Sequence, residues 1–216
     1  MSGEAKGKRA RRGCFARAAF WLLLIAALAA LVFWRYEDYR RKLIESSGLQ
    51  IAPVYQYDYK EAVCTIGGED KSVASSGCGA TCMSMVIDYL TGNERQSPQL
   101  LFERAYANGD YYGDGLSHEA IDRLGIAYDV EGIWIGRDED KLREALAAGY
   151  PVIAHMGSGT FTRSGHYILL RGLTDDGRVV VNDPNSEKRS YQAYDLSLII
   201  REAKTDAPFM VCRRAK

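Results

Sequence analysis

The stretch GHYILLRGLTDDGRVVVNDPN, residues 165–185, decides how the second half of this chain folds. Two apolar segments, 166–171 and 179–182, are rich in Ile, Leu and Val, which is typical of short β-strands. Between them, TDDG at 174–177 has the composition of a turn. The stretch therefore predicts an antiparallel β-hairpin.

The position of the turn brings two chemically active side chains together. Folding the chain about residue 175 places His166 opposite roughly residue 184, so His166 and Asp183 are expected to meet at the open end of the hairpin. A carboxylate beside an imidazole fixes its tautomer and stabilises its protonated form. The alternative is a structural histidine at a sheet edge and an aspartate that ends a strand.

Outward from the hairpin, helices are expected before it and strands around it. The helices run from Cys78 to about Leu90, from Ser97-Pro98 to before Gly109, from Ser117 to Gly125 and from Asp138 to Gly149. The strands are Val152–Met156, His166–Arg171, Val179–Asn182 and Phe209–Cys212. Helices followed by antiparallel strands predict an α+β domain over residues 51–216.

Cys78 is the candidate nucleophile because it opens a predicted helix. The unpaired N–H groups and the positive dipole end of a first turn favour thiolate over thiol. Gly77 and Gly79 flank it and are expected to leave backbone room for a substrate. The alternative is a small buried residue at a helix start.

Other histidines and cysteines have weaker interpretations. His155 is a rival base without an acidic neighbour in an equivalent position, and His118 is expected on the surface. A zinc site could use Cys78, Cys82 and a histidine, but no fourth ligand is evident, so no metal is expected. No cofactor is expected either. A disulfide between Cys64 and Cys212 is left open.

An uncharged apolar run of 17 residues, 18–34, indicates a membrane anchor. As a helix it spans roughly 25 Å, near the lower limit for a bilayer. The denser basic flank precedes it, which predicts a cytoplasmic tail over 1–17, a juxtamembrane linker over 35–50 and an extracellular domain from 51. The alternative is a cleaved signal peptide with a site near Ala27-Leu28-Ala29.

Charge is divided unevenly along the chain although the net charge is zero. Residues 1–42 hold ten Lys/Arg against three Asp/Glu, and residues 43–216 hold 18 against 25. An acidic globular part argues against nucleic acid as a partner, because phosphate binding needs a basic surface.

Two motifs resemble the peptidase C39-like family of papain-like cysteine peptidases, which is related to bacteriocin-leader-processing peptidases. SSGCGATCMSMV at 75–86 is similar to the family's nucleophile segment, with Ala80 and Cys82 at its usual Pro and Ser positions. PVIAHMGSGTFT at 151–162, GHYILLRG at 165–172 and VNDPN at 181–185 follow in the family's order. His155 and Ser164 stand at positions where the family usually has smaller residues.

The resemblance implies a papain-like fold with Cys78, His166 and Asp183 as the catalytic residues, acting on a peptide or protein through a thioester. A weaker match, YQYDY at 55–59, implies that Gln56 and the backbone N–H of Cys78 form the oxyanion hole. Gly165 and Tyr57 are expected to contact substrate, with an exposed surface tyrosine as the alternative for Tyr57.

Two further functions fit the same residues. One is a catalytically silent module that binds peptides with the same fold. The other is an acyl transferase or transpeptidase that passes the thioester to an amine.

Overall fold

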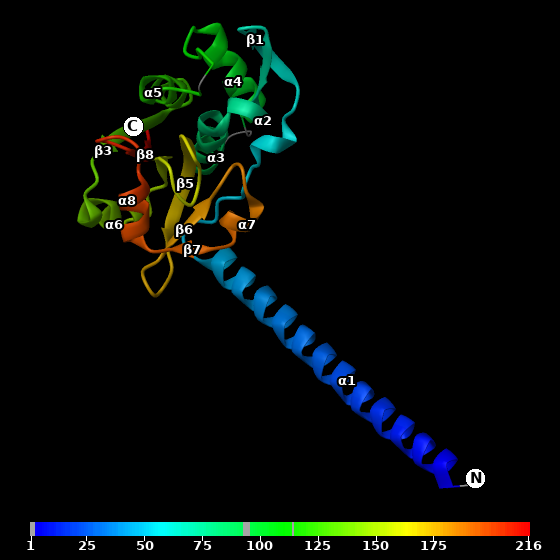
Figure 1. Cartoon of the computed structure of the whole chain (residues 1–216). Coiled ribbons are helices and arrows are strands. Elements are labelled where there is room, and N and C mark those ends of the chain that lie inside the picture. Colours follow the sequence, from blue (N-terminus) through cyan, green and yellow to red (C-terminus); the bar gives the residue numbers. More distant parts are fainter. Residues whose placement is uncertain (1–2, 93–95, 114) are drawn as a thin grey trace. The chain divides into compact units, whose positions relative to one another are not determined.

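The computed structural model describes residues 3–92, 96–113 and 115–216 (Figure 1). It divides into two compact units, Met1–Leu43 and Ile44–Lys216. Helix α1 spans Gly3–Ser46. Within it, Phe20–Ser46 is long and apolar enough to cross a membrane, and its most apolar window is not buried by the protein.

The second unit is built on a six-stranded sheet in the order β3-β8-β4-β5-β6-β7, in which every neighbouring pair is antiparallel. A separate two-stranded sheet pairs β1 with β2. The strands are β1 Ala62–Ile66, β2 Glu69–Ser72, β3 Val130–Ile135, β4 Val152–Met156, β5 His166–Leu173, β6 Val179–Asn182, β7 Ala193–Tyr194 and β8 Phe209–Arg214.

Helices cover both faces of the large sheet because its central strands are apolar on both sides. On β5, Tyr167 and Leu169 join the core shared with α3, α4 and α5, whereas Ile168 and Leu170 face α6 and α8. The helical elements are η1 Gln56–Asp58, α2 Val73–Ser76, α3 Cys78–Thr91, α4 Pro98–Ala107, α5 His118–Ile126, α6 Glu139–Ala147, α7 Glu187–Ser190 and α8 Leu196–Glu202.

Arg171 ties the start of the second unit to β5. Its guanidinium donates to the carbonyl oxygens of Ser47, Leu49 (3.1 Å) and Ile44 (2.5 Å), and is buried. Gly172, with φ +137°, follows it, and a β-carbon there would lie 2.7 Å from the Cα of Gly48. This close approach requires glycine.

The α+β class is confirmed, and the predicted helices and strands are present within one or two residues of their expected ends. The expectation that all strands follow the helices is wrong for three of them. In chain order, the β1–β2 hairpin precedes α3, and β3 lies between α5 and α6. In the sheet, β3 pairs with the last strand, β8. Chain order therefore does not separate the helices from the strands in this domain.

Candidate active site

Cys78 is the first residue of α3 and is partly exposed. Gly77 holds the N-cap position and supplies no side-chain cap, so the first N–H groups of the helix keep their donor capacity. The backbone N–H groups of Gly79 and Tyr167 lower the pKa of the Cys78 thiol. These donors stabilise a thiolate at this position.

A side chain at either glycine beside Cys78 would meet the protein itself, so packing favours glycine at both positions, and their contact with a substrate stays a prediction. Gly77 is buried, and a β-carbon there would lie 2.6 Å from the Cα of Val73. At Gly79, a β-carbon would lie 3.2 Å from Ile121 and 3.3 Å from Tyr167. The space at both glycines is therefore occupied by the protein itself.

The hairpin of β5 and β6 brings His166 to Asp183. His166 is the first residue of β5, Asp183 follows the last residue of β6, and a bulge between Leu170 and Gly172 adjusts the register. His166 Nε2 lies 2.8 Å from Asp183 Oδ1, and both residues are buried. This contact leaves Nδ1 as the ring nitrogen available to the Cys78 sulfur.

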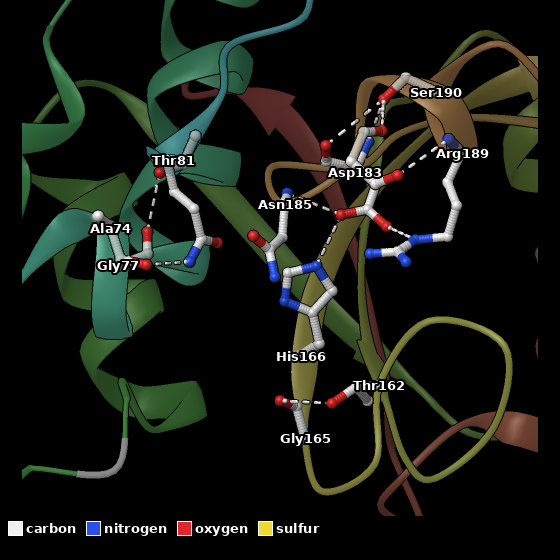
Figure 2. A network of polar contacts seen from close by, with 12 residues as sticks. Ala74, Gly77, Thr81, Thr162, Gly165, His166, Asp183, Asn185, Arg189 and Ser190 are labelled. Carbon is white, nitrogen blue, oxygen red and sulfur yellow. Dashed lines mark hydrogen bonds and ion pairs between the residues drawn. The ribbon is translucent and has the colours of Figure 1, made fainter. Parts of the chain in front are cut away.

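Groups other than His166 also hold Asp183 in place (Figure 2). Arg189 Nε donates to Oδ2 at 2.5 Å and the backbone N–H of Asn185 donates to Oδ1 at 2.8 Å. The backbone N–H of Asp183 donates to Ser190 Oγ at 2.9 Å. Burial alone would raise the pKa of Asp183, but the hydrogen bonds from His166 and Arg189 lower it. Asp183 is therefore a fixed anion.

Cys78 and His166 form a hydrogen-bonded pair whose charges support one another. Burial opposes ionisation of Cys78, but the hydrogen bond and charge of His166, together with the backbone N–H groups of Tyr167 and Gly79, lower the thiol pKa overall. Burial also opposes protonation of His166, but Asp183 and Cys78 raise the imidazole pKa to about 9. The lowered pKa of Cys78 and the raised pKa of His166 both favour a thiolate beside an imidazolium, the pairing that an activated nucleophile needs.

Gln56 connects the segment before the nucleophile to the end of the hairpin. Its side chain is buried and donates from Nε2 to the carbonyl oxygen of Ala74 at 3.0 Å. Its backbone N–H donates to the carbonyl oxygen of Pro184 at 2.8 Å. An amide nitrogen carries two hydrogens, so Nε2 retains one donor beyond the bond to Ala74.

His155 lies beside the site but is not paired with a carboxylate among the described residues. It is half-buried in β4, its ring stacks on Tyr167 at 4.3 Å, and its Nδ1 lies 3.1 Å from His118 Nε2. Burial, then His118, lower the pKa of His155 to about 4, so its imidazole is neutral at pH 7. His118 is half-buried and stacked on Trp134 at 3.7 Å, which corrects its expected surface position.

A pocket of about 350 Å³ lies beside the nucleophile. Cys78, His166 and Gly165 line it, which places Gly165 at the site, and His155 and Lys204 complete its polar wall. Tyr57 does not line this pocket within the described residues; it is exposed and stacks on Tyr55 at 5.2 Å.

No disulfide joins the four cysteines whose side chains the structure describes. Cys64, Cys78, Cys82 and Cys212 are free thiols, so the pair left open between Cys64 and Cys212 is not bonded in this structure. Burial raises the pKa of Cys82 and Cys212, which keeps both thiols neutral. Over the described ranges, no group of three or more His, Cys, Asp or Glu residues is arranged to hold a metal ion.

Sequence reasoning missed Arg189 and Lys204. Arg189 lies six residues beyond Asp183 on the short helix α7, and the NDPN segment that turns the chain back was the available signal. Lys204 has no motif of its own and reaches the site because the backbone after α8 bonds to His155.

One protein-family model and several solved structures match this chain. The model of the family described as Peptidase_C39 like family matches residues 49–205. No curated protein matches the sequence.

Solved structures of peptidase domains are similar to the chain. The peptidase domain of Streptococcus ComA, a bi-functional ABC transporter involved in quorum sensing, matches with a TM-score of 0.50 and 18% identity, over 65% of this chain and 92% of that one. A double glycine motif protease from an AMS/PCAT transporter, solved with a leader peptide, matches with a TM-score of 0.48 and 18% identity, over 77% and 100%.

Proposed function

This chain belongs to the peptidase C39-like family, and we propose that it is a thiol hydrolase that cleaves a peptide or amide bond. The observation that carries the proposal is the alignment of Cys78, His166 and Asp183, with the imidazole hydrogen-bonded on one side to the sulfur and on the other to a buried carboxylate. The pKa shifts of the three groups all favour the protonation states that nucleophilic catalysis needs.

The first step is attack of the Cys78 thiolate on the substrate carbonyl carbon. The carbon–sulfur bond forms as the carbonyl electron pair moves onto oxygen, and His166 then donates its proton to the leaving nitrogen. Asp183 keeps the imidazole oriented and stabilises its positive charge, and Arg189 holds Asp183 in turn. The products of this step are a released amine and a thioester on Cys78.

The oxyanion of this step needs hydrogen-bond donors. We assign the role to the backbone N–H of Cys78, at the start of α3, and to the second N–H of Gln56 Nε2. Such a donor contributes about 3–4 kcal/mol to stabilisation of the transition state. Water, deprotonated by the now neutral His166, then attacks the thioester and returns Cys78 to its thiolate form.

The N-terminal helix is proposed to anchor this activity at a membrane. Phe20–Ser46 has sufficient length and apolar character, and its large side chains from Phe20 to Trp34 are exposed. The basic residues that precede it support a cytoplasmic N-terminus, so we propose that the domain lies on the outer side.

The proposal is tested with the full chain in detergent micelles against a peptide library, with Cys78→Ala as the control. We expect cleavage that the control lacks, while its thermal unfolding midpoint stays near that of the wild type. Product masses measured with and without added amines separate hydrolysis from acyl transfer. Absence of cleavage in the wild type, with Cys78 unreactive toward alkylating agents, contradicts the proposal.

A further inference from the structure

The pocket beside Cys78 contains a cation that the proposed mechanism does not use. Lys204 lines it together with Cys78, His166 and Gly165. A β-carbon at Gly165 would lie 2.6 Å from Lys204 Nζ, so the ammonium group lies directly against the residue before His166. The backbone position of Lys204 is fixed, because its N–H donates to the carbonyl oxygen of His155 at 2.9 Å.

No acidic side chain of the described residues neutralises this ammonium group. None of the ion pairs that the structure describes includes Lys204. Glu202, two residues earlier, is bound by Thr160, whose N–H and hydroxyl donate to its two carboxylate oxygens at 2.7 and 3.0 Å. The described lining of the pocket contains no Asp or Glu.

The proposed mechanism assigns the leaving group to this pocket. His166 must reach the leaving nitrogen to protonate it, and His166 lines the pocket together with Cys78, Gly165 and Lys204. The proposed oxyanion donor, Gln56, is not among the described residues that line it. A leaving group released next to His166 therefore has its substituents close to Lys204.

We infer that this pocket binds a carboxylate on the leaving-group side of the scissile bond, and that Lys204 is the residue that selects it. The inference rests on the proposed hydrolase function and names its substrate class: peptides whose residue after the scissile bond carries an acidic side chain or a free terminal carboxylate. An ammonium group close to the reacting bond favours such a substrate over the neutral amide. The remainder of the domain is acidic, so the positive charge of Lys204 also opposes the negative electrostatic field of the domain.

The test compares kcat/KM of the full chain in detergent micelles on two matched peptide pairs. One pair has Glu or Gln after the scissile bond with an amidated C-terminus. The other releases a single residue with a free or an amidated carboxyl group. We expect roughly tenfold preference for the acid in at least one pair, as for a charge-assisted hydrogen bond. Lys204→Met should abolish that preference and Lys204→Glu should reverse it.

Arg163→Met is the matched control. Arg163 is exposed in the loop that precedes β5, and its loss changes the net charge equally, but it is not among the described residues that line the pocket. This variant should retain the preference for the acid. Equal loss in both variants would mean that general charge, and not Lys204, sets the preference, which overturns the inference.

A second measurement separates this inference from the hydrolase proposal. Iodoacetate and iodoacetamide both alkylate a thiolate, with loss of iodide, and differ in one carboxylate. The ratio of their rates at Cys78, measured by peptide mass mapping, should fall about tenfold in Lys204→Met. If no peptide is cleaved but the ratio of alkylation rates falls in Lys204→Met, the pocket selects anionic ligands through Lys204, and the hydrolase proposal alone fails. If peptides are cleaved, yet neither the acid preference nor the ratio depends on Lys204, the inference fails alone.

Discussion

The backbone N–H of Gln56 is hydrogen-bonded to the carbonyl oxygen of Pro184 at 2.8 Å, one residue beyond the carboxylate that orients His166. The side chain of the same glutamine bonds to Ala74, in the helix turn that precedes Cys78. Gln56 therefore joins the nucleophile side of the site to the acid–base side.

The oxyanion role of Gln56 is tested by Gln56→Met, which removes the donors and keeps a similar volume. We expect kcat to fall about 10²–10³-fold. Alkylation of Cys78 by iodoacetamide forms no oxyanion, so its rate should stay close to that of the wild type. A parallel loss of alkylation would contradict the role and indicate damage to the Cys78–His166 pair.

The pH dependence of kcat/KM follows from the charges of that pair. The pKa of Cys78 is lowered and the pKa of His166 is raised to about 9, so the ion pair exists between the two values. Activity should fall in acid as Cys78 gains a proton and in alkali as His166 loses one, with the alkaline limb near pH 9.

The alkaline limb also tests Asp183. Asp183→Asn removes the negative charge and keeps an oxygen that can accept from the imidazole. The pKa of His166 should fall toward its ordinary value of about 6.5, which moves the alkaline limb to lower pH, and kcat should fall at least about tenfold. An unchanged limb would show that Asp183 does not hold the imidazolium.

Arg189 should support the site through Asp183. Arg189→Met leaves Asp183 Oδ2 without its charged donor in a buried position, so the free energy of unfolding should fall by about 1–3 kcal/mol. Lys188→Met, an exposed change on the same helix, is the control and should change stability little. Urea unfolding of both variants checks this prediction, and equal free energies of unfolding for Arg189→Met and Lys188→Met would refute it.

The close approach at Gly172 predicts a change in stability and not in chemistry. Gly172→Ala places a β-carbon 2.7 Å from the Cα of Gly48, at φ +137°, and should cost more than about 1 kcal/mol. Gly67→Ala is the control, because φ there is +61° and no atom lies within 4 Å of the added carbon. If both variants unfold at the same urea concentration, the packing argument is wrong.

The sequence predicted the part of the site that depends on local geometry. The turn at 174–177 determines where His166 and Asp183 meet, and the position of Cys78 at the start of α3 determines its environment. Strand β3 was missed because Gly132 interrupts its pattern and its partner, β8, is the last strand of the chain. Its pairing is a long-range contact that no local signal announces.

Arg189 and Lys204 were missed for a related reason. Each reaches the site through a chain reversal: Arg189 through the turn after Asp183, and Lys204 through a backbone bond to His155. The packing role of the glycines beside Cys78 was missed because residue type alone does not show that Val73, Ile121 and Tyr167 occupy their space.

The most direct test of the account is the pH dependence of Cys78 alkylation in the wild type and in His166→Asn. The account predicts that iodoacetamide modifies Cys78 rapidly well below pH 8.5, the ordinary pKa of a cysteine, and that the variant loses this reactivity. Alkylation that rises only with a pKa near 8.5 in both proteins would contradict the thiolate–imidazolium pair on which the proposed chemistry depends.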